Sequence, residues 1–269
     1  MGRKLFFDAS LSADRKVSCA TCHDPARAFT DGRVVAQGVH NAKGTRNTPS
    51  LVNAGNGRLF FWDGRADSLE VQALQPMINP KEMGLSEAEI ATRAGMPLPD
   101  VVAALASYMR TIRSGESRFD YFRAGQPEML TADERAGHEL FRGRARCITC
   151  HGGPHLTDDR FHNTGIGVGT DGQPVDAGRY EISQDERERG AFKTPTLREV
   201  ALTAPYMHDG IKATLEDVVE FYSKGGGRSA YLDPRMQPFP LTGGEKQQLV
   251  AFLKTLSGRI TEGLPGGVR

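Results

Sequence analysis

The sequence has no excess of charge of one sign and no long hydrophobic run. The net charge is +1 over 269 residues, which gives no basis for nucleic-acid binding. No apolar stretch approaches the length of a membrane span, and the segment after Arg3 and Lys4 is too short in apolar residues to be a signal peptide. Hydrophobic residues make up only 38%, and strand-like alternation is scarce. These features predict a mostly α-helical protein with long loops.

Cysteine is also scarce, with 4 in the whole chain, and all of them fall into one repeated pattern. The pattern CxxCH occurs at Cys19, Cys22 and His23 and again at Cys147, Cys150 and His151. Two thiols at this spacing can add to the vinyl groups of a haem, while the imidazole that follows ligates the iron. The pattern therefore predicts two covalent c-type haems and no disulfide.

Two other uses of a CxxC pair fit the sequence less well. A structural zinc site needs four ligands, and the histidine directly after each pair would then be a coincidence. A thioredoxin-like redox pair is found in a βαβ pattern, which is missing here. Covalent haem attachment of this type takes place outside the cytoplasm. We therefore expect a periplasmic protein whose signal peptide has been removed.

Four landmarks occur in the same order in both halves of the chain. They are Gly2–Phe6 and Gly137–Phe141, Asn47–Leu51 and Lys193–Leu197, Trp62–Gly64 and His208–Gly210, and Tyr108–Ile112 and Phe252–Leu256. Such a series indicates a tandem duplication with one haem in each copy. We predict two cytochrome c-like domains, residues 1–130 and 131–269, with a linker at 115–130. The second copy contains an extra loop at about 158–190, and a loop of that length is often functional or covers a cofactor.

Several helices can be predicted from their first turns and apolar faces. The S/T-x-x-E form of a helix start occurs at Ser86, Thr131 and Thr242. Apolar residues at helical spacing predict one buried face each, at Val101, Leu105, Tyr108 and Ile112 and at Leu249, Phe252, Leu253 and Leu256.

The repeat predicts that the two irons differ on the side opposite His23 and His151. Thirteen residues after the Asp of the Asp-Gly landmark, the first copy has Pro76 and the second has Tyr222. Proline cannot ligate iron, whereas a phenolate can, so we expect an open first haem and a second haem closed by Tyr222. Met207 and Met236 are alternative ligands of the second iron. Tyr222 could also be an aromatic residue that only packs.

Three further residues of the first copy are candidates for peroxide chemistry. Gln72 precedes Pro76 by one helical turn, and Glu82 follows shortly after. A glutamate beside a bound peroxide can take its proton and return it to the leaving oxygen, while a glutamine can hold that oxygen by a hydrogen bond. Trp62 is the only tryptophan and is easily oxidised, although a core aromatic residue would suit the same position.

These residues resemble the bacterial di-haem cytochrome c peroxidases, a family that includes the MauG-type enzymes. The likeness covers nearly the whole chain and is carried by long motifs in the family's order, at 2–8, 46–49, 61–66, 192–197 and 204–210. The resemblance implies that Trp62 lies between the haems and that Gln72, Pro76 and Glu82 line the peroxide pocket. It also implies a calcium ion whose ligands are Asn47, Thr203 and Pro205.

Two departures bear on the subclass. Ordinary members of the family carry methionine at the position of Tyr222, and the MauG type carries tyrosine. Ordinary members also have a loop histidine that caps the first haem, where this chain has Val39, with His40 one residue away. We expect the first haem to be open, and ligation by His40 stays an alternative.

The sequence therefore predicts a di-haem oxidoreductase that reduces hydrogen peroxide at an open N-terminal haem, with electrons relayed through the C-terminal haem. The electron donor would be a small cytochrome c or a cupredoxin. One alternative is a MauG-type enzyme that oxidises tryptophans of a partner protein through a high-valent di-haem state. Another is a non-catalytic di-haem electron carrier. A homodimer, which many members of the family form, is left open.

Overall fold

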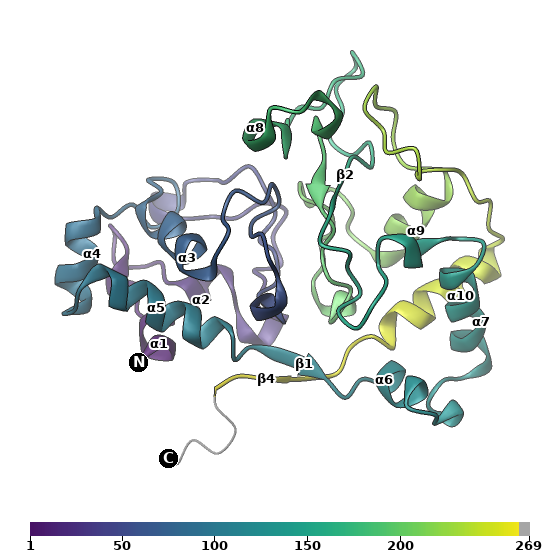
Figure 1. Cartoon of the computed structure of the whole chain (residues 1–269), viewed down its shortest axis with the longest axis horizontal. Helices are drawn as coiled ribbons and strands as arrows, with labels where there is room; N and C mark the ends of the chain where they lie inside the picture. The colour runs from purple at the N-terminus through teal and green to yellow at the C-terminus, as the bar shows by residue number, and fades with distance from the viewer. Residues whose placement is uncertain (264–269) are drawn as a thin grey trace. The chain divides into compact units, whose positions relative to one another are not determined.

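The computed structural model describes residues 1–263 and is mostly helical (Figure 1). The chain forms two compact units. The first consists of residues 1–61, 66–113 and 260–263, and the second of residues 62–65 and 114–259. The predicted mostly α-helical class is confirmed, and the assignment of one haem to each of residues 1–130 and 131–269 stays a prediction.

The first unit is built around its longest helix. Its α-helices are α1 (Gly2–Phe6), α2 (Cys19–Cys22), α3 (Leu69–Ile78), α4 (Glu87–Ala94) and α5 (Leu98–Met109). The face of α5 predicted from the sequence is buried, since Val101, Leu105 and Tyr108 are each at most 5% exposed. α1 packs on this helix at very short range. A Cβ atom at Gly2 would lie 1.9 Å from the carbonyl oxygen of Ala104, so only glycine permits this approach.

The second unit repeats this arrangement with longer partners. Its α-helices are α6 (Arg118–Arg123), α7 (Ala132–Arg142), α8 (Tyr180–Ser183), α9 (Leu215–Ser223) and α10 (Gly243–Lys254). α7 packs on α10, and a Cβ atom at Gly137 would lie 2.0 Å from the carbonyl oxygen of Gln248. The glycine that opens the first landmark of each copy therefore has one structural reason in both: it lets its helix pack at very short range against a 12-residue helix.

Strands are few and short within residues 1–263. β1 (Arg113–Gly115) pairs with β4 (Arg259–Thr261), and β2 (Phe161–His162) pairs with β3 (Phe192–Lys193). The second pair is antiparallel, with His162 opposite Phe192. Short 3₁₀ turns connect the helices: η1 (Ala9–Leu11), η2 (Pro25–Arg27), η3 (Val39–Asn41), η4 (Ala54–Asn56), η5 (Pro127–Met129), η6 (Cys147–Thr149), η7 (Glu186–Glu188) and η8 (Val200–Leu202).

The predicted helix starts are confirmed. Ser86, Thr131 and Thr242 each cap a helix in the reciprocal arrangement, in which the hydroxyl and the carboxylate three residues later satisfy each other's backbone amides. The predicted linker is wrong in part, because 115–130 contains α6. Phe119 of that helix is 5% exposed within the second core, so the segment is packed rather than extended.

Among residues 1–263, no helix is both long enough and apolar enough to cross a bilayer.

Candidate haem centres

The first CxxCH motif is one turn of helix followed by a held imidazole. α2 places Cys19 and Cys22 on the same turn, and the helix is capped by Ser18, whose amide donates to Thr21 Oγ1 at 2.9 Å. The amide of His23 donates to the carbonyl of Cys19 at 2.8 Å, which closes the turn. The Nδ1 atom of His23 lies 3.0 Å from the carbonyl oxygen of Phe29.

The second motif makes the same contacts, but its cysteines begin on a 3₁₀ turn instead of an α-helical turn. η6 holds Cys147, and the amide of His151 donates to the carbonyl of Cys147 at 2.9 Å. The Nδ1 atom of His151 lies 3.1 Å from the carbonyl oxygen of Leu156. Phe29 and Leu156 both have left-handed backbones, with φ of 59° and 54°. This conformation turns each carbonyl back toward its histidine, a feature that no sequence pattern announced.

These contacts prepare both histidines for iron. A carbonyl oxygen only accepts, so each Nδ1 carries the hydrogen and each Nε2 keeps its lone pair. Burial lowers the pKa of His23 and His151, so the neutral form that metals bind is favoured at pH 7. The backbones of Pro49 and Pro195, from the second landmark of each repeat, also face these rings.

The four cysteines are free thiols. Burial raises the pKa of Cys19 and Cys147 to about 12, so both are protonated before a cofactor binds. The chemistry of the two motifs thus fits haem: thiols at the vinyl spacing, and an imidazole with Nε2 available.

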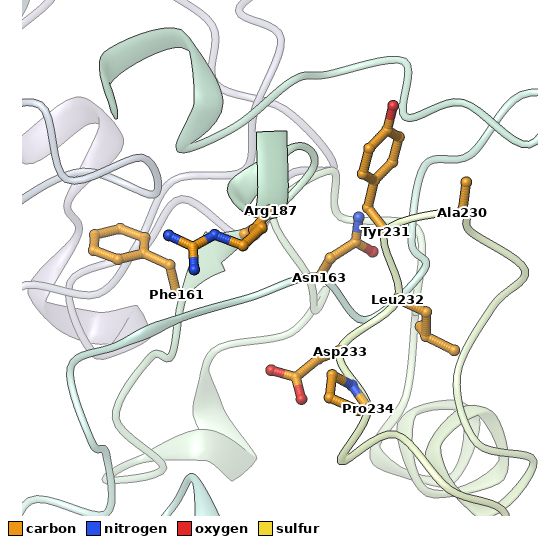
Figure 2. Close-up of a pocket in the computed structure, with 9 residues that line it drawn as sticks. Phe161, Asn163, Arg187, Ala230, Tyr231, Leu232, Asp233 and Pro234 are labelled. Carbon is orange, nitrogen blue, oxygen red and sulfur yellow. The ribbon is translucent and has the colours of Figure 1, made fainter. Parts of the chain in front are cut away.

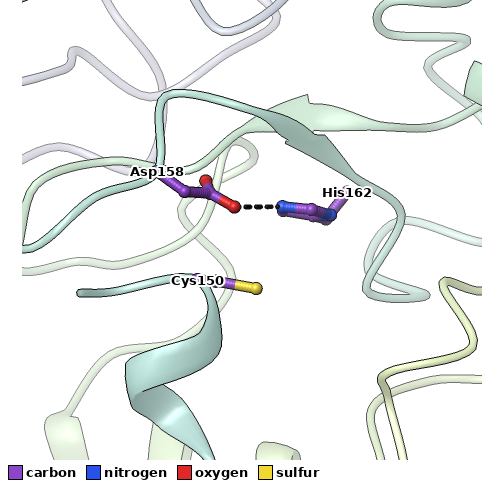
Figure 3. Close-up of side chains that lie close together, drawn as sticks. All are labelled: Cys150, Asp158 and His162. Carbon is purple, nitrogen blue, oxygen red and sulfur yellow. Dashed lines mark hydrogen bonds and ion pairs between the residues drawn. The ribbon is translucent and has the colours of Figure 1, made fainter.

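One other group of side chains is close enough to hold a metal ion among residues 1–263. The ligand atoms of Cys150, Asp158 and His162 lie within 4.8 Å of one another (Figure 3). Both ring nitrogens of His162 already contact carboxylates, so the imidazole has no lone pair to offer. Attachment of a haem would also convert the Cys150 thiol to a thioether. A metal ion is therefore a poor fit.

The candidate peroxide residues of the first unit lie on two consecutive segments. Gln72 and Pro76 are four residues apart on α3 and so share a face of that helix, and both are half-buried. Glu82 follows in the turn after α3, where its carboxylate accepts from Asn79 Nδ2 at 2.8 Å.

Glu82 is connected to the first CxxCH motif through one loop. The Sγ atom of Cys22 contacts the carbonyl oxygen of Gln37 at 3.8 Å. Gly38 lies directly against Glu82, since a Cβ atom there would be 2.5 Å from Glu82 Cα. The charge of Glu82 contributes, after burial and Asp31, to a raised pKa of Cys22, to about 11. The glutamate is thus within electrostatic reach of the haem-attachment thiol.

The loop that could cap the first haem presents its histidine outward. Val39 is 2% exposed, and its amide donates to the carbonyl of Glu82 at 2.8 Å. His40 is exposed in a left-handed conformation, with φ of 54°. Its amide donates to a carboxylate oxygen of Asp14 at 3.1 Å. This orientation supports the expectation of an open first haem.

Tyr222 lies on α9 near the second motif. Burial raises the pKa of its phenol, and the thiols of Cys147 and Cys150 add to that effect, so the hydroxyl is close to both. Met236 lies in the same region, because a Cβ atom at Gly226 would be 2.9 Å from its Cε. Met207 has a left-handed backbone, with φ of 74°. Tyr222 stays the predicted ligand, with the two methionines as alternatives.

Trp62 belongs to the second unit, and its backbone is held there. Its carbonyl accepts from the amide of Lys193 at 2.8 Å. The guanidinium of Arg179, from the extra loop of the second repeat, donates to the carbonyls of Asp63 and Gly64, each at 3.0 Å. The same guanidinium stacks 4.5 Å from the ring centre of Phe161. Sequence reasoning missed Arg179, because nothing in its local pattern marks it.

The residues implied as calcium ligands come from two segments of the chain. Asn47 is 7% exposed, and its side-chain nitrogen donates to the carbonyl of Arg33 at 2.7 Å. The hydroxyl of Thr203 donates to the carbonyl of Val200 at 3.3 Å, and Pro205 follows in the same loop. The calcium ion stays a prediction.

A cavity of about 390 Å³ opens in the second unit (Figure 2). It is lined by Phe161, Asn163, Arg187, Ala191, Ala230, Tyr231, Leu232, Asp233 and Pro234. Its polar groups already have partners, since Arg187 pairs with Asp185 and Asp233 with Arg235. We assign no ligand to this cavity.

Comparison with known proteins shows similarity that is not confined to these motifs. A model of the family described as di-haem cytochrome c peroxidase matches residues 1–128. The methylamine utilization protein MauG of Methylorubrum extorquens is 40% identical, over 95% of this chain and 77% of its own length. The cytochrome-c peroxidase IdrP2 of Denitromonas iodatirespirans is 35% identical, over 96% of this chain and 81% of its own.

A solved structure shares the fold. The crystal structure of a MauG-like protein associated with microbial copper homeostasis superimposes with a TM-score of 0.88 and 37% identity, over 96% of this chain and 88% of that one. Sequence and structural similarity therefore both extend through the two repeats and both CxxCH motifs. On this basis the chain belongs to the di-haem cytochrome c peroxidase family of oxidoreductases.

Proposed function

We propose that this protein reduces hydrogen peroxide at a haem held by the first CxxCH motif, with electrons relayed through a haem held by the second. Each peroxide takes up two electrons and two protons and gives two water molecules. The observation that carries the proposal is the placement of Glu82, which is joined to Cys22 through the loop at Gln37 and Gly38. That contact supports a role for Glu82 as the acid–base group of the predicted open haem.

The haem would supply the iron to which peroxide binds and the redox equivalents that break its O–O bond. Glu82 takes the proton from the bound oxygen and returns it to the leaving oxygen. Gln72 donates a hydrogen bond to the same peroxide from α3. Pro76 offers no ligand atom on that helix face, so a haem held by His23 would be left with a site at which peroxide could bind.

Substitution of Glu82 tests this role. Glu82→Gln should slow the reaction of the oxidised protein with peroxide by roughly two to four orders of magnitude, because the proton transfer is lost while size is kept. Stopped-flow spectra of the haem bands measure the rate. Glu87→Gln, an exposed glutamate at the start of α4, is the matched control and should leave it unchanged. A loss of less than tenfold in Glu82→Gln would remove Glu82 from the mechanism.

A second function, tryptophan oxidation on a partner protein, is favoured by Tyr222. The phenol lies near Cys147 and Cys150, where the MauG type carries its tyrosine ligand, and the MauG protein of M. extorquens is 40% identical. The two activities differ in the reductant that returns the protein to its resting state. Small cytochromes and cupredoxins are to be compared with candidate partner proteins in this assay, and a partner whose tryptophans gain oxygen would favour the MauG type.

A plain electron carrier would lack peroxide chemistry altogether. Ferric spectra separate the classes, because a carrier has two low-spin haems that are unaffected by stoichiometric peroxide, whereas an open first haem is high-spin. Absence of a high-spin signal in both redox states would contradict the open site.

We further propose a periplasmic location, based on the covalent haem attachment, and a calcium ion at Asn47, Thr203 and Pro205, which metal analysis of the purified protein would test.

A further inference from the structure

His162 is held between two carboxylates in the second unit. It is 8% exposed on β2, and its Nε2 lies 3.0 Å from a carboxylate oxygen of Asp158. Its Nδ1 lies 2.7 Å from a carboxylate oxygen of Asp233, which is far away in the sequence. Arg235 binds the same aspartate through Nε and a terminal nitrogen, each at 3.0 Å. Two acids and two bases thus form one cluster, in which His162 is buried and Arg235 lies at the exposed edge.

This geometry sets the charge of the imidazole. An ionised carboxylate only accepts hydrogen bonds, so the ring nitrogens that face Asp158 and Asp233 both donate, and only the imidazolium has two N–H groups. A guanidinium nitrogen of Arg235 also lies 3.1 Å from Nδ1, but it donates to Asp233 at 3.0 Å, and the contact of Nδ1 with Asp233 at 2.7 Å is the shorter one. Although burial by itself lowers the pKa of His162, hydrogen bonds with Cys150, Asp158 and Asp233 raise it to about 9. The contribution of Cys150 to this raised pKa is lost when its sulfur becomes a thioether, whereas the contributions of both carboxylates remain.

Within residues 1–263, the second repeat has this cluster and the first repeat does not. Asp31 of the first copy corresponds to Asp158, because each lies two residues after the carbonyl that holds the haem histidine. Asp31 accepts from Thr48 at 3.0 Å and has no histidine beside it, since the position of His162 is taken by Val35. The added cation and its second aspartate are therefore unnecessary for the fold of a repeat and call for a role specific to the second one.

We propose that His162 is a positioning residue of the second haem site, a fixed cation that ties the extra loop to the 228–237 segment beside Cys150 and raises the reduction potential of the haem attached there. A buried positive charge favours the reduced form, which has one positive charge fewer than the oxidised form. The inference rests on the part of the proposed function that attaches a haem at Cys147 and Cys150. It requires no peroxide chemistry.

Redox titration of the haem-loaded protein tests the inference. His162→Gln removes one buried positive charge and should lower one of the two midpoint potentials, shifting that haem's reduced-to-oxidised ratio about tenfold, or about 59 mV for a one-electron couple. Asp233→Asn removes one negative charge and should raise the same potential. The double variant should return it toward the wild-type value. Arg160→Gln, an exposed positive charge in the same loop, should change little because water screens it.

The haem content of each variant is measured first, as a pyridine haemochrome, so that loss of cofactor is distinguished from a change in potential. The inference would be overturned if wild type, His162→Gln and Asp233→Asn each contained two haems and had the same two midpoint potentials. If His162→Gln fails to fold, Asp233→Asn still gives a decisive shift of the opposite sign. A protein with normal shifts but no peroxide turnover would contradict the proposed function and leave this inference standing.

Discussion

At the scale of single residues, the buried histidines differ in charge because their neighbours differ. His23 and His151 face backbone carbonyls and stay neutral, with one nitrogen available for iron. His162 faces two carboxylates and is a cation. The Nδ1 atom of His138, on α7, makes no hydrogen bond, and the ring is surrounded by aromatic side chains. The same side chain is therefore suited to ligating a metal, to carrying a fixed charge and to packing in a core, depending on its neighbours.

His138 gives a pH-dependent stability that can be predicted with its sign. Its ring is 8% exposed and lies 5.0 to 5.6 Å from the rings of Phe119, Phe122 and Phe252. Burial lowers the pKa of His138, so the unfolded chain takes up its proton first as the pH falls. Stability is therefore complete above pH ~6.5 and declines below it, as the pH falls toward the folded-state pKa.

Substitution of His138 should remove this pH dependence. The Nδ1 atom is buried without a hydrogen bond, and its distance to Glu139 is 3.8 Å. His138→Leu should be more stable than wild type by about 1 kcal/mol at pH 5, with a smaller difference at pH 8. Calorimetry at both values measures this. His155→Leu, a half-buried histidine of the same unit, is the control. An equal pH dependence in His138→Leu and wild type would show that other groups cause it.

At the scale of elements, a close contact between two helices at a glycine recurs in both units. Gly2 on α1 and Gly137 on α7 each lie so close to a backbone carbonyl of the partner helix that an added Cβ atom would clash with it. Gly137→Ala should force α7 away from α10 and lower the free energy of unfolding by about 1–3 kcal/mol, the usual cost of overpacking. Urea unfolding of the haem-loaded protein measures the change.

The same substitution elsewhere provides the control. Gly244 lies in the first turn of α10, where an added Cβ would meet no atom within 4 Å. Gly244→Ala should be neutral or stabilise the protein by up to about 1 kcal/mol, because alanine favours the helix. A neutral result for Gly137→Ala would mean that α7 and α10 can separate without loss of packing.

Elements with local signals could be predicted from the sequence, and those set by distant contacts could not. The helix starts at Ser86, Thr131 and Thr242 follow from four-residue patterns, and the buried faces of α5 and α10 from spacing. α6 was missed because six charged and aromatic residues carry no clear period. Its Phe119 is fixed by the rings of His138 and Phe252, which are far along the chain.

At the scale of the whole molecule, the duplication allowed the two haem motifs to be predicted from the sequence. The differences between the two copies could be predicted only in part. The two CxxCH motifs and the pair Pro76 and Tyr222 could be found by comparing one copy with the other. The pair His162 and Asp233 could not, because the two residues are 71 positions apart and have no counterpart in the first copy. The carbonyls that hold the haem histidines depend on left-handed backbone angles, which residue type does not predict.

Each unit has its own motif, its own hydrophobic core and its own carbonyl that holds the histidine. We therefore predict that Cys19→Ser with Cys22→Ser yields a folded protein with one covalent haem, seen as the loss of one haem in the intact mass. Its spectrum then belongs to the second haem alone, so adding Tyr222→Phe should change the spectrum if the phenolate is the ligand. An unchanged spectrum would assign the role to Met207 or Met236. Loss of both haems in the cysteine variant would show that the second motif is loaded only after the first.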